Sequence, residues 1–335
     1  MRLSAMGDVA MTVPVLRAFA KQYPDVKITV VSRPFFKPFF DDIPNLSFFE
    51  FDEQKYKGFF GLIKLFNDLK PLQVDAFADL HDVLRSKVIR TLFALSGKKT
   101  ASVDKGRQGK KELTRTENKI FKQLPTMFER HAEVLKQFGF PIDLSNPSFP
   151  PKQNLDSETT NLTGTKTQNW IGIAPFAQYD SKVYPLDLLR KVIDELSKNT
   201  NYKIFLFGSK KEIETLDSLS KGSENVINIA GKIKFRQELQ LISNLDIMLS
   251  MDSGNAHIAA MLGIKVITLW GATHPFTGFL PFNQTMGTVL VSDREKFPKL
   301  PTSVYGNKKV EGYEDAMRTI APEMVVSKIK KILEK

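Results

Sequence analysis

The sequence predicts an α/β protein built from two parallel-sheet domains, and three observations support this prediction. The chain has 335 residues, more than a single hydrophobic core usually organises. Apolar, β-branched segments alternate with amphipathic helical segments in both halves, which is typical of parallel sheets with helices on both faces. Between the halves, residues 141–167 are rich in Pro, Ser, Thr and Asn and show little periodicity. We therefore predict an N-terminal domain over residues 1–150, a linker over 151–168 and a C-terminal domain over 169–335.

The first half alternates strands and helices along its length. Residues 1–3 are the only candidate for a first strand, and two further strands are expected at residues 27–32 and 75–80. Because Pro is favoured in the first turn of a helix, Pro14 predicts a first helix with Thr12 near its N-cap. Helical periodicity marks residues 15–22, 59–69, 86–95 and 127–138.

The second half repeats this alternation. Short apolar runs predict strands at residues 170–174, 203–207, 226–229, 245–250 and 265–270. Helices are expected at residues 186–198, 211–219, 235–243 and 322–335, with a further helix that begins near Ser253. Ligands of such sheets bind at the carboxyl ends of the strands, and a cleft between two domains is a favoured place for an active site.

The composition limits the class of protein and its partners. The chain contains no cysteine, which excludes disulfides, thiolate catalysis and cysteine metal sites. No apolar run approaches the roughly 20 residues of a membrane span, and the start lacks the apolar core of a signal peptide, so we expect a cytoplasmic protein. The net charge of +11 favours nucleic acid, an anionic membrane surface or a polyanionic substrate as partner. No nucleic-acid-binding pattern is visible, which argues against the first.

Much of the positive charge lies in one basic segment, residues 98–122. A solvated, mobile loop is one interpretation of this segment, and a surface for an anionic partner is the other. Its cations are Lys98, Lys99, Lys105, Arg107, Lys110, Lys111, Arg115, Lys119 and Lys122.

Residues 251–260, Met-Asp-Ser-Gly-Asn-Ala-His-Ile-Ala-Ala, form the most informative motif. They place a carboxylate (Asp252), a hydroxyl (Ser253), a glycine (Gly254) and a histidine (His257) where a buried strand turns into a helix. The unpaired amides at a helix N-terminus suit a phosphate group. The alternative is a capped helix with nothing bound, since Ser-Gly turns are common.

Two other polar turns follow expected strands. In the turn over residues 4–12, Gly7 allows a sharp bend, and Asp8 would project from the carboxyl edge of the sheet, where it could act as a general base. The alternative is a carboxylate that caps a helix or a turn. The loop after residue 174 presents Lys182, which could be a point charge for a phosphate or an ordinary surface lysine.

Taken together, these segments resemble glycosyltransferase family 9, the bacterial lipopolysaccharide heptosyltransferases. The resemblance covers nearly the whole chain, in the family's order and spacing. One departure is Trp270, which stands where the family usually has a smaller aromatic residue. The matching residues are 2–9, 12–14, Lys182 with Tyr184 and Pro185, 230–232, 252–259 and 271–273.

The resemblance implies a GT-B fold, with two Rossmann-like domains facing a central cleft. The N-terminal domain would bind the acceptor, and the C-terminal domain would bind the nucleotide-sugar. Transfer would invert the anomeric carbon and need neither metal nor cofactor. Asp8 matches the family's catalytic base, and a carboxylate is suited to this role because an acceptor hydroxyl is a poor nucleophile until its proton is taken.

The resemblance also assigns the donor-binding residues. Lys182 and the amides of the helix that begins near Ser253 would stabilise the leaving diphosphate. Asp252 would bind hydroxyls of the donor sugar, and His257 would lie close to the diphosphate. The expected donor-binding set is Lys182, Asp252, Ser253, Gly254, Asn255, His257 and Thr273.

The acceptor side depends on residues 79–86, which look like the family's acceptor-facing segment. His81 and Arg85 would contact acidic sugar or phosphate groups, and the alternative is a capped helix with a solvated arginine. Exposed aromatics beside the basic segment would suit an acylated, membrane-held acceptor, although phenylalanines more often form a core. The aromatic residues in question are Phe35, Phe36, Phe39, Phe40, Phe59 and Phe60.

The leading hypothesis is therefore an enzyme that transfers a heptose from ADP-heptose to the inner core of a lipopolysaccharide acceptor of the lipid A/Kdo type. We expect it in the cytoplasm, with peripheral contact to the anionic inner membrane and no nucleic-acid partner. Two alternatives stay open. One is a GT-B nucleotide-sugar epimerase, and the other is a non-catalytic protein that binds an anionic glycan.

Overall fold

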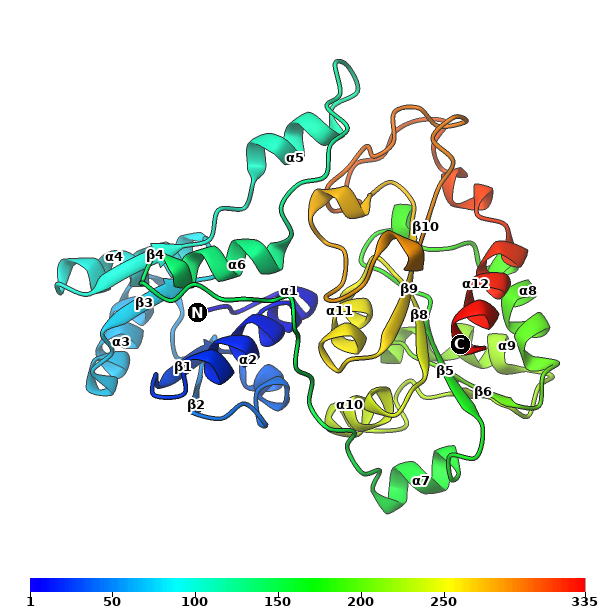
Figure 1. Ribbon diagram of the computed structural model, residues 1–335, viewed down its shortest axis with the longest axis horizontal. Coiled ribbons are helices and arrows are strands. Elements are labelled where there is room, and N and C mark those ends of the chain that lie inside the picture. The colour runs from blue at the N-terminus through cyan, green and yellow to red at the C-terminus, as the bar shows by residue number, and fades with distance from the viewer. Residues whose placement is uncertain (335) are drawn as a thin grey trace. The chain divides into compact units, whose positions relative to one another are not determined.

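The computed structural model describes residues 1–334 and divides the chain into two compact units (Figure 1). Unit 1 comprises Met1–Arg107 and Pro125–Ser148, and unit 2 comprises Gln108–Leu124 and the chain from Phe149 on. The observed division after Ser148 lies close to the predicted end of the first domain at residue 150. Residues Gln108–Leu124 belong to unit 2, although their place in the sequence had put them in the first domain.

Unit 1 contains a parallel arrangement of five extended segments. Strand β1 pairs with β2, and β3 pairs with β4, both in parallel. Residues 1–3 lie between the two pairs, because the Arg2 amide donates to the Val31 carbonyl and the Met1 carbonyl accepts from the Leu80 amide, each at 3.2 Å. The predicted first strand is thus a short central segment. The four regular strands are β1 (Ile28–Ser32), β2 (Leu46–Glu50), β3 (Ala76–Asp79) and β4 (Lys99–Ser102).

Helices α2, α3, α4 and α6 begin within two residues of the predicted starts, whereas helix α1 lies in the segment over 4–12 that was expected to be a turn. Helix α2 starts at Val13 with Thr12 as its N-cap residue, as Pro14 indicates. The α-helices are α1 (Met6–Ala10), α2 (Val13–Gln22), α3 (Gly58–Leu69), α4 (Leu84–Leu95) and α6 (Met127–Lys136), and the 3-10 helices are η1 (Pro34–Phe39) and η2 (Lys70–Leu72).

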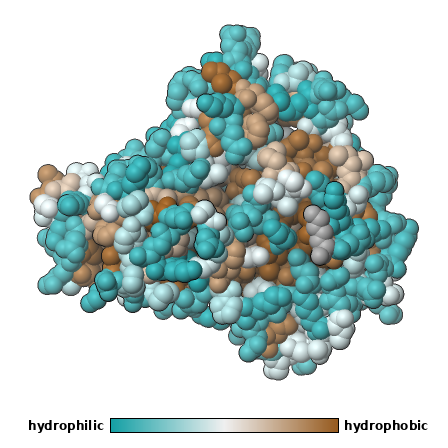
Figure 2. All heavy atoms as spheres, in the orientation of Figure 1, coloured by the Kyte–Doolittle hydropathy of each residue, from teal (hydrophilic) through white to brown (hydrophobic). Residues whose placement is uncertain are grey.

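The phenylalanines of unit 1 divide between core and surface. Phe36, Phe39 and Phe40 are buried, so the core interpretation is correct for them. Phe59 and Phe60 are 62% and 84% exposed at the start of α3. Most of the visible molecular surface is hydrophilic, with apolar residues in small groups between (Figure 2). Among residues 1–334 the longest helices have 12 residues, which is short of the roughly 20 that span a bilayer.

Unit 2 is built on a six-stranded parallel sheet with the order β10-β9-β8-β5-β6-β7. Along the chain, the strand order changes direction between β5 and β8, which are paired neighbours. This is the topological switch point, the place where ligands bind in open parallel sheets. The strands are β5 (Asn169–Ala174), β6 (Tyr202–Leu206), β7 (Val226–Asn228), β8 (Ile247–Met251), β9 (Lys265–Trp270) and β10 (Val289–Val291).

Helices cover both faces of this sheet. Figure 1 shows α10 and α11 on one side of the strands and α8, α9 and α12 on the other. One core cluster of this unit is largely aliphatic. The aromatic side chains of Trp170, Trp270, Phe205 and Phe207 are also fully buried. The α-helices are α7 (Ser157–Thr163), α8 (Leu186–Ser197), α9 (Ile213–Ser220), α10 (Phe235–Ser243), α11 (Gly254–Met261) and α12 (Pro322–Leu333); the 3-10 helices are η3 (Asp180–Lys182), η4 (Lys210–Glu212), η5 (Pro275–Thr277), η6 (Met286–Thr288) and η7 (Ala316–Thr319).

Two segments expected to be irregular contain regular structure. The predicted linker over 151–168 includes α7, whose N-cap Asp156 accepts a hydrogen bond from the Thr159 amide. The basic segment over 98–122 contains β4 and helix α5 (Arg107–Thr114), and Lys110 on α5 is buried. The interpretation of the basic segment as a wholly solvated, mobile loop is therefore wrong.

The first prediction concerns the aromatic core of unit 1. Phe93 on α4 stacks on Phe77 at a ring distance of 4.9 Å and meets Phe66 edge-on at 5.1 Å. Phe93→Ala should lower the free energy of unfolding by about 3–5 kcal/mol, because it removes a buried ring from a packed cluster. Leu95→Ala is the matched control, since Leu95 lies on the same helix but is 81% exposed. Urea unfolding followed by circular dichroism checks this, and equal effects of the two variants would contradict it.

Candidate functional site

Three polar side chains meet at the switch point of unit 2. Lys182 lies in the loop after β5, Asp252 directly follows β8, and Thr273 follows β9. The Lys182 Nζ atom lies 3.2 Å from Asp252 Oδ2, and the Thr273 hydroxyl donates to the same oxygen at 2.8 Å. The side chains of the ion pair are only 12% and 9% exposed. The structure therefore brings together three of the residues predicted to bind the donor.

The backbone around Lys182 fixes the direction of its side chain. The Ser181 hydroxyl donates to the Gly306 carbonyl at 2.7 Å, and the Ala272 amide donates to the Ser181 carbonyl at 3.0 Å. A Cβ atom at Gly306, where φ is +87°, would lie 2.7 Å from Lys182 Cγ. A Cβ atom at Gly271 would collide with the Ser181 carbonyl oxygen. Glycine at these two positions therefore allows the backbone to pack closely against Ser181 and the Lys182 stem, whose ammonium group lies beside Asp252.

The N-terminus of α11 lies directly after Asp252. Ser253 is the N-cap residue, but its hydroxyl lies 3.1 Å from Ser250 Oγ and does not bond to the amides of the first helical turn. Ser253, Gly254 and Asn255 are partly exposed, whereas His257, one turn further on, is buried. The Ser253 side chain therefore does not cap the amides of the first helical turn. This differs from the alternative expected from the sequence, a capped helix with nothing bound.

The polar group around Lys182 and Asp252 has defined chemical capabilities. A lysine and a helix N-terminus together offer positive charge and N–H donors to an anion. The carboxylate of Asp252, beside them, accepts hydrogen bonds from hydroxyl groups. A ligand that carries both phosphate and hydroxyls would match this combination.

In unit 1, Asp8 lies on α1, directly after the short central segment. Its Oδ2 atom lies 2.6 Å from Arg2 Nη2 and accepts a hydrogen bond from the Ala5 amide at 3.2 Å. Arg2 is buried, and its Nη1 atom donates to the Leu80 carbonyl at 2.8 Å. The guanidinium thus orients the Asp8 carboxylate relative to the end of β3. The Asp8 side chain remains 30% exposed and can be reached by a ligand.

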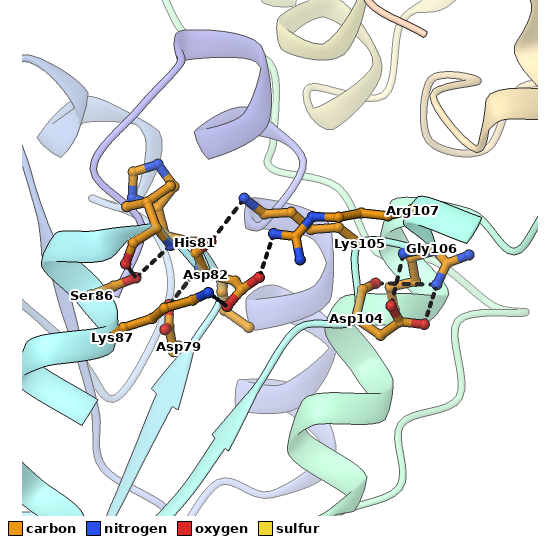
Figure 3. A network of polar contacts seen from close by, with 12 residues as sticks. Asp79, His81, Asp82, Ser86, Lys87, Asp104, Lys105, Gly106 and Arg107 are labelled. Carbon is orange, nitrogen blue, oxygen red and sulfur yellow. Dashed lines mark hydrogen bonds and ion pairs between the residues drawn. The ribbon is translucent and has the colours of Figure 1, made fainter. Parts of the chain in front are cut away.

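The turn after β3 contains a polar network, shown in Figure 3. The fully buried Asp79 accepts hydrogen bonds from the amides of His81 (3.0 Å) and Asp82 (2.8 Å). Asp82 adopts a left-handed conformation with φ of +47°, which aspartate tolerates better than most residues. Three cationic side chains surround Asp82. Its carboxylate lies 2.8 Å from Arg107 Nη2 and 3.4 Å from Lys87 Nζ. Its backbone carbonyl accepts a hydrogen bond from Lys105 Nζ at 3.1 Å.

Burial sets the charge of the histidines near Asp8. The pKa of His81 is lowered to about 4 by burial and by the nearby positive charges of Arg2 and Lys105. The pKa of His131 on α6 is lowered to about 3, chiefly because its side chain is fully buried. Both imidazoles are therefore neutral at pH 7, and His81 can offer an acceptor only hydrogen bonds, without a positive charge.

Arg85 lies in a separate ion-pair group. Its Nη1 atom is 3.0 Å from Glu53 Oε1, and Arg33 Nη2 lies 2.7 Å from the same oxygen. Ser86 bonds to the Val83 amide at the start of α4. The structure thus shows a partnered, exposed Arg85 beside a hydrogen-bonded helix start, which matches the structural alternative for this residue. No contact in unit 1 joins Arg85 to Asp8 among the hydrogen bonds and ion pairs of the described residues.

The sequence alone does not reveal some of the residues in these two polar groups. Arg2 lies within the first motif, yet only the structure shows that it pairs with Asp8. Asp79 and Asp82 flank His81, a spacing that could have indicated a hydrogen-bonded turn after a strand. Gly306 has no sequence signal, because its contact with Lys182 joins segments more than 100 residues apart.

These observations define the class of protein. Two α/β units, each with polar side chains at the carboxyl ends of its parallel strands, form the GT-B fold of nucleotide-sugar-dependent glycosyltransferases. The chain belongs to glycosyltransferase family 9 (heptosyltransferase), whose family model matches residues 62–308. The match includes Lys182, Asp252 and Thr273.

Similar proteins support this assignment. The chain is 25% identical over 343 residues to lipopolysaccharide core heptosyltransferase OpsX of Haemophilus influenzae, covering 99% of this chain and 95% of that protein. The solved structure of a family 9 glycosyltransferase from Veillonella parvula has a TM-score of 0.75 at 19% identity, covering 99% and 96% of the two chains. Escherichia coli heptosyltransferase WaaC with ADP has a TM-score of 0.64 at 19% identity, with coverage of 99% and 96%.

The second prediction concerns pH and His131. An unfolded histidine has a pKa of about 6.5, so between pH 7 and pH 5 the unfolded chain takes up a proton that buried His131 does not. The free energy of unfolding should therefore fall by about 2 kcal/mol per such histidine over this interval. In His131→Leu, the loss between pH 7 and pH 5 should be smaller by about this amount.

Urea unfolding of both proteins at the two pH values measures this difference. The other buried histidines titrate alike in both proteins, so the comparison isolates His131. The same pH-dependent loss in the variant would show that His131 does not resist protonation in the folded protein.

Proposed function

We propose that this protein transfers a heptose from ADP-heptose to the inner core of a lipopolysaccharide acceptor of the lipid A/Kdo type, with inversion and without a metal. Membership of family 9 and the similarity to OpsX over nearly the full length of both chains support heptosyl transfer in lipopolysaccharide synthesis. A solved relative, Escherichia coli WaaC, contains ADP-2-deoxy-2-fluoro heptose, which supports an ADP-linked donor. A membrane-anchored acceptor favours action at the cytoplasmic face of the inner membrane.

One observation carries the proposal: the Lys182–Asp252 pair at the switch point of unit 2, beside the N-terminus of α11. The leaving nucleoside diphosphate gains negative charge as the glycosidic bond breaks. The Lys182 ammonium and the amides of Gly254 and Asn255 supply preorganised positive charge and N–H donors for it. The Asp252 carboxylate, which accepts a hydrogen bond from Thr273, would also accept hydrogen bonds from hydroxyls of the donor sugar. His257 would lie close to the diphosphate.

Asp8 supplies the base in this proposal. The acceptor hydroxyl oxygen forms a bond to the anomeric carbon while the bond from that carbon to the diphosphate oxygen breaks. The hydroxyl proton passes to the Asp8 carboxylate, and the diphosphate leaves with the electron pair of the broken bond. A single displacement of this kind inverts the anomeric centre. Arg2 acts as a positioning residue, because it fixes the carboxylate on which the step depends.

Acceptor binding is assigned to the turn after β3. Neutral His81 would hydrogen-bond to the acceptor, and the cations around Asp82 would face its acidic groups. Arg85 lies exposed beside this turn. It would add a further contact if its ion pair with Glu53 were replaced by one with an acidic group of the acceptor.

The third prediction tests the base. Asp8→Ala should lower kcat by about 10²–10⁴-fold, the usual contribution of a general base. Its affinity for ADP should stay within twofold of the parent protein, because Asp8 and the nucleotide-binding residues lie in different units. ADP release assays and calorimetry measure the two quantities. Asp25→Ala removes an exposed carboxylate of the same unit and is the control. Near-normal turnover of Asp8→Ala would rule out this role.

The fourth prediction tests the diphosphate subsite. Lys182→Met should weaken ADP binding by about 10- to 100-fold, because it removes a charge-assisted contact from a site that keeps the Asp252 carboxylate. Lys191→Met makes the same substitution at an exposed lysine on α8 and should leave the affinity unchanged. Titration calorimetry with ADP reads out both. If the Lys182 variant binds ADP as well as the control does, the subsite lies elsewhere.

A further inference from the structure

A strap, residues 108–124, leaves unit 1 after Arg107, packs within unit 2 and returns at Pro125. Its two ends are fixed. The preceding residue, Arg107, is paired with Asp82 (Figure 3). At the other end, the Leu124 amide donates to the Phe276 carbonyl at 3.0 Å. The strap is therefore an ordered insertion of the acceptor-binding half of the chain that belongs structurally to the donor-binding unit.

Phe121 is the aromatic side chain through which this strap contacts the segment after β9. Its ring meets the rings of His274 and Phe276 at centroid distances of 5.0 Å each. The Arg294 guanidinium lies 3.4 Å from the centre of the Phe121 ring, a close cation–π contact. Nearby, Lys119 Nζ donates to the Pro301 carbonyl at 2.8 Å. The Phe121 ring thus lies between a histidine and an arginine of unit 2.

The partner of Phe121 adjoins the donor-binding residues. His274 directly follows Thr273, whose hydroxyl bonds to Asp252. His274 is 5% exposed, and its Nδ1 atom accepts a hydrogen bond from the Phe276 amide at 3.1 Å. Burial and the charge of Arg294 lower the pKa of His274 to about 4, so the ring is neutral and can accept this bond at pH 7. The imidazole therefore fixes the turn into η5.

We propose that Phe121 is a positioning residue of the donor site: it holds His274, and through it the orientation of Thr273 and of the Asp252 carboxylate. The proposal rests on the donor subsite assigned above. Without the Phe121 ring, the His274 side chain loses the surface that covers it, and the backbone of residues 273–276 gains freedom. Binding of the nucleotide must then order this loop, which reduces affinity.

The test compares three variants by calorimetry with ADP and by steady-state kinetics with the sugar donor. Phe121→Ala should weaken ADP binding by about 5- to 10-fold and raise the donor KM to a similar extent, with kcat changed less than twofold. Phe121→Tyr keeps the ring and should restore both values to within twofold. Ile120→Ala removes the neighbouring, exposed apolar side chain and should leave them unchanged. Thermal unfolding verifies that all variants are folded.

Each other outcome has a defined meaning. Unchanged ADP affinity in Phe121→Ala, while Lys182→Met loses affinity, would overturn the positioning role and leave the donor subsite intact. Equal losses in Phe121→Ala and Ile120→Ala would also overturn it, because they would indicate a general effect of the strap. Unchanged affinity in Lys182→Met would contradict the proposed donor subsite itself. If Phe121→Ala does not fold, failure of Phe121→Tyr to bind ADP normally overturns the positioning role.

Discussion

The ion pair between Lys182 and Asp252 is the interaction on which the proposed donor site of unit 2 depends. Removing two charges from water costs free energy, and a nearly buried pair recovers it only with good geometry and further hydrogen bonds. Here the Thr273 hydroxyl supplies one such bond, and the backbone at Gly306 packs closely against the lysine stem. Such a pair need not stabilise the fold. It does keep both charges oriented toward a ligand that carries phosphate and hydroxyl groups.

The two units place their polar side chains by the same topology. In unit 2 the switch point lies between β5 and β8, and Lys182 and Asp252 follow these strands. In unit 1 the corresponding neighbours are the segment of residues 1–3 and β3. Asp8 and His81 follow them, and Arg2 links the two turns. Each unit therefore places one carboxylate at the point where adjacent loops diverge, the position that a parallel sheet leaves open.

The fold was largely predictable because most of its elements carry a strong hydrophobic period. Strand β9 and helix α10 have the bounds that the sequence indicates. Strand β4, Lys99–Ser102, was missed because it pairs with only one strand, β3, and contains only one apolar residue, Ala101. The strap could not be assigned from local sequence, since its place in unit 2 depends on contacts between distant parts of the chain, such as those of Phe121 with His274 and Phe276. For the site, Lys182 and Asp252 were identified by motif, whereas Arg2 and His274 required tertiary contacts.

The most direct test of the account is a reaction of the purified protein with ADP-heptose and a Kdo-lipid A acceptor in the presence of a metal chelator. A single displacement with Asp8 as base predicts one ADP released per heptose transferred, and a product whose anomeric configuration is opposite to that of the donor. ADP release should require the acceptor. Isomerised donor without acceptor would indicate an epimerase, and a product that retains the donor configuration would contradict a single displacement with Asp8 as base.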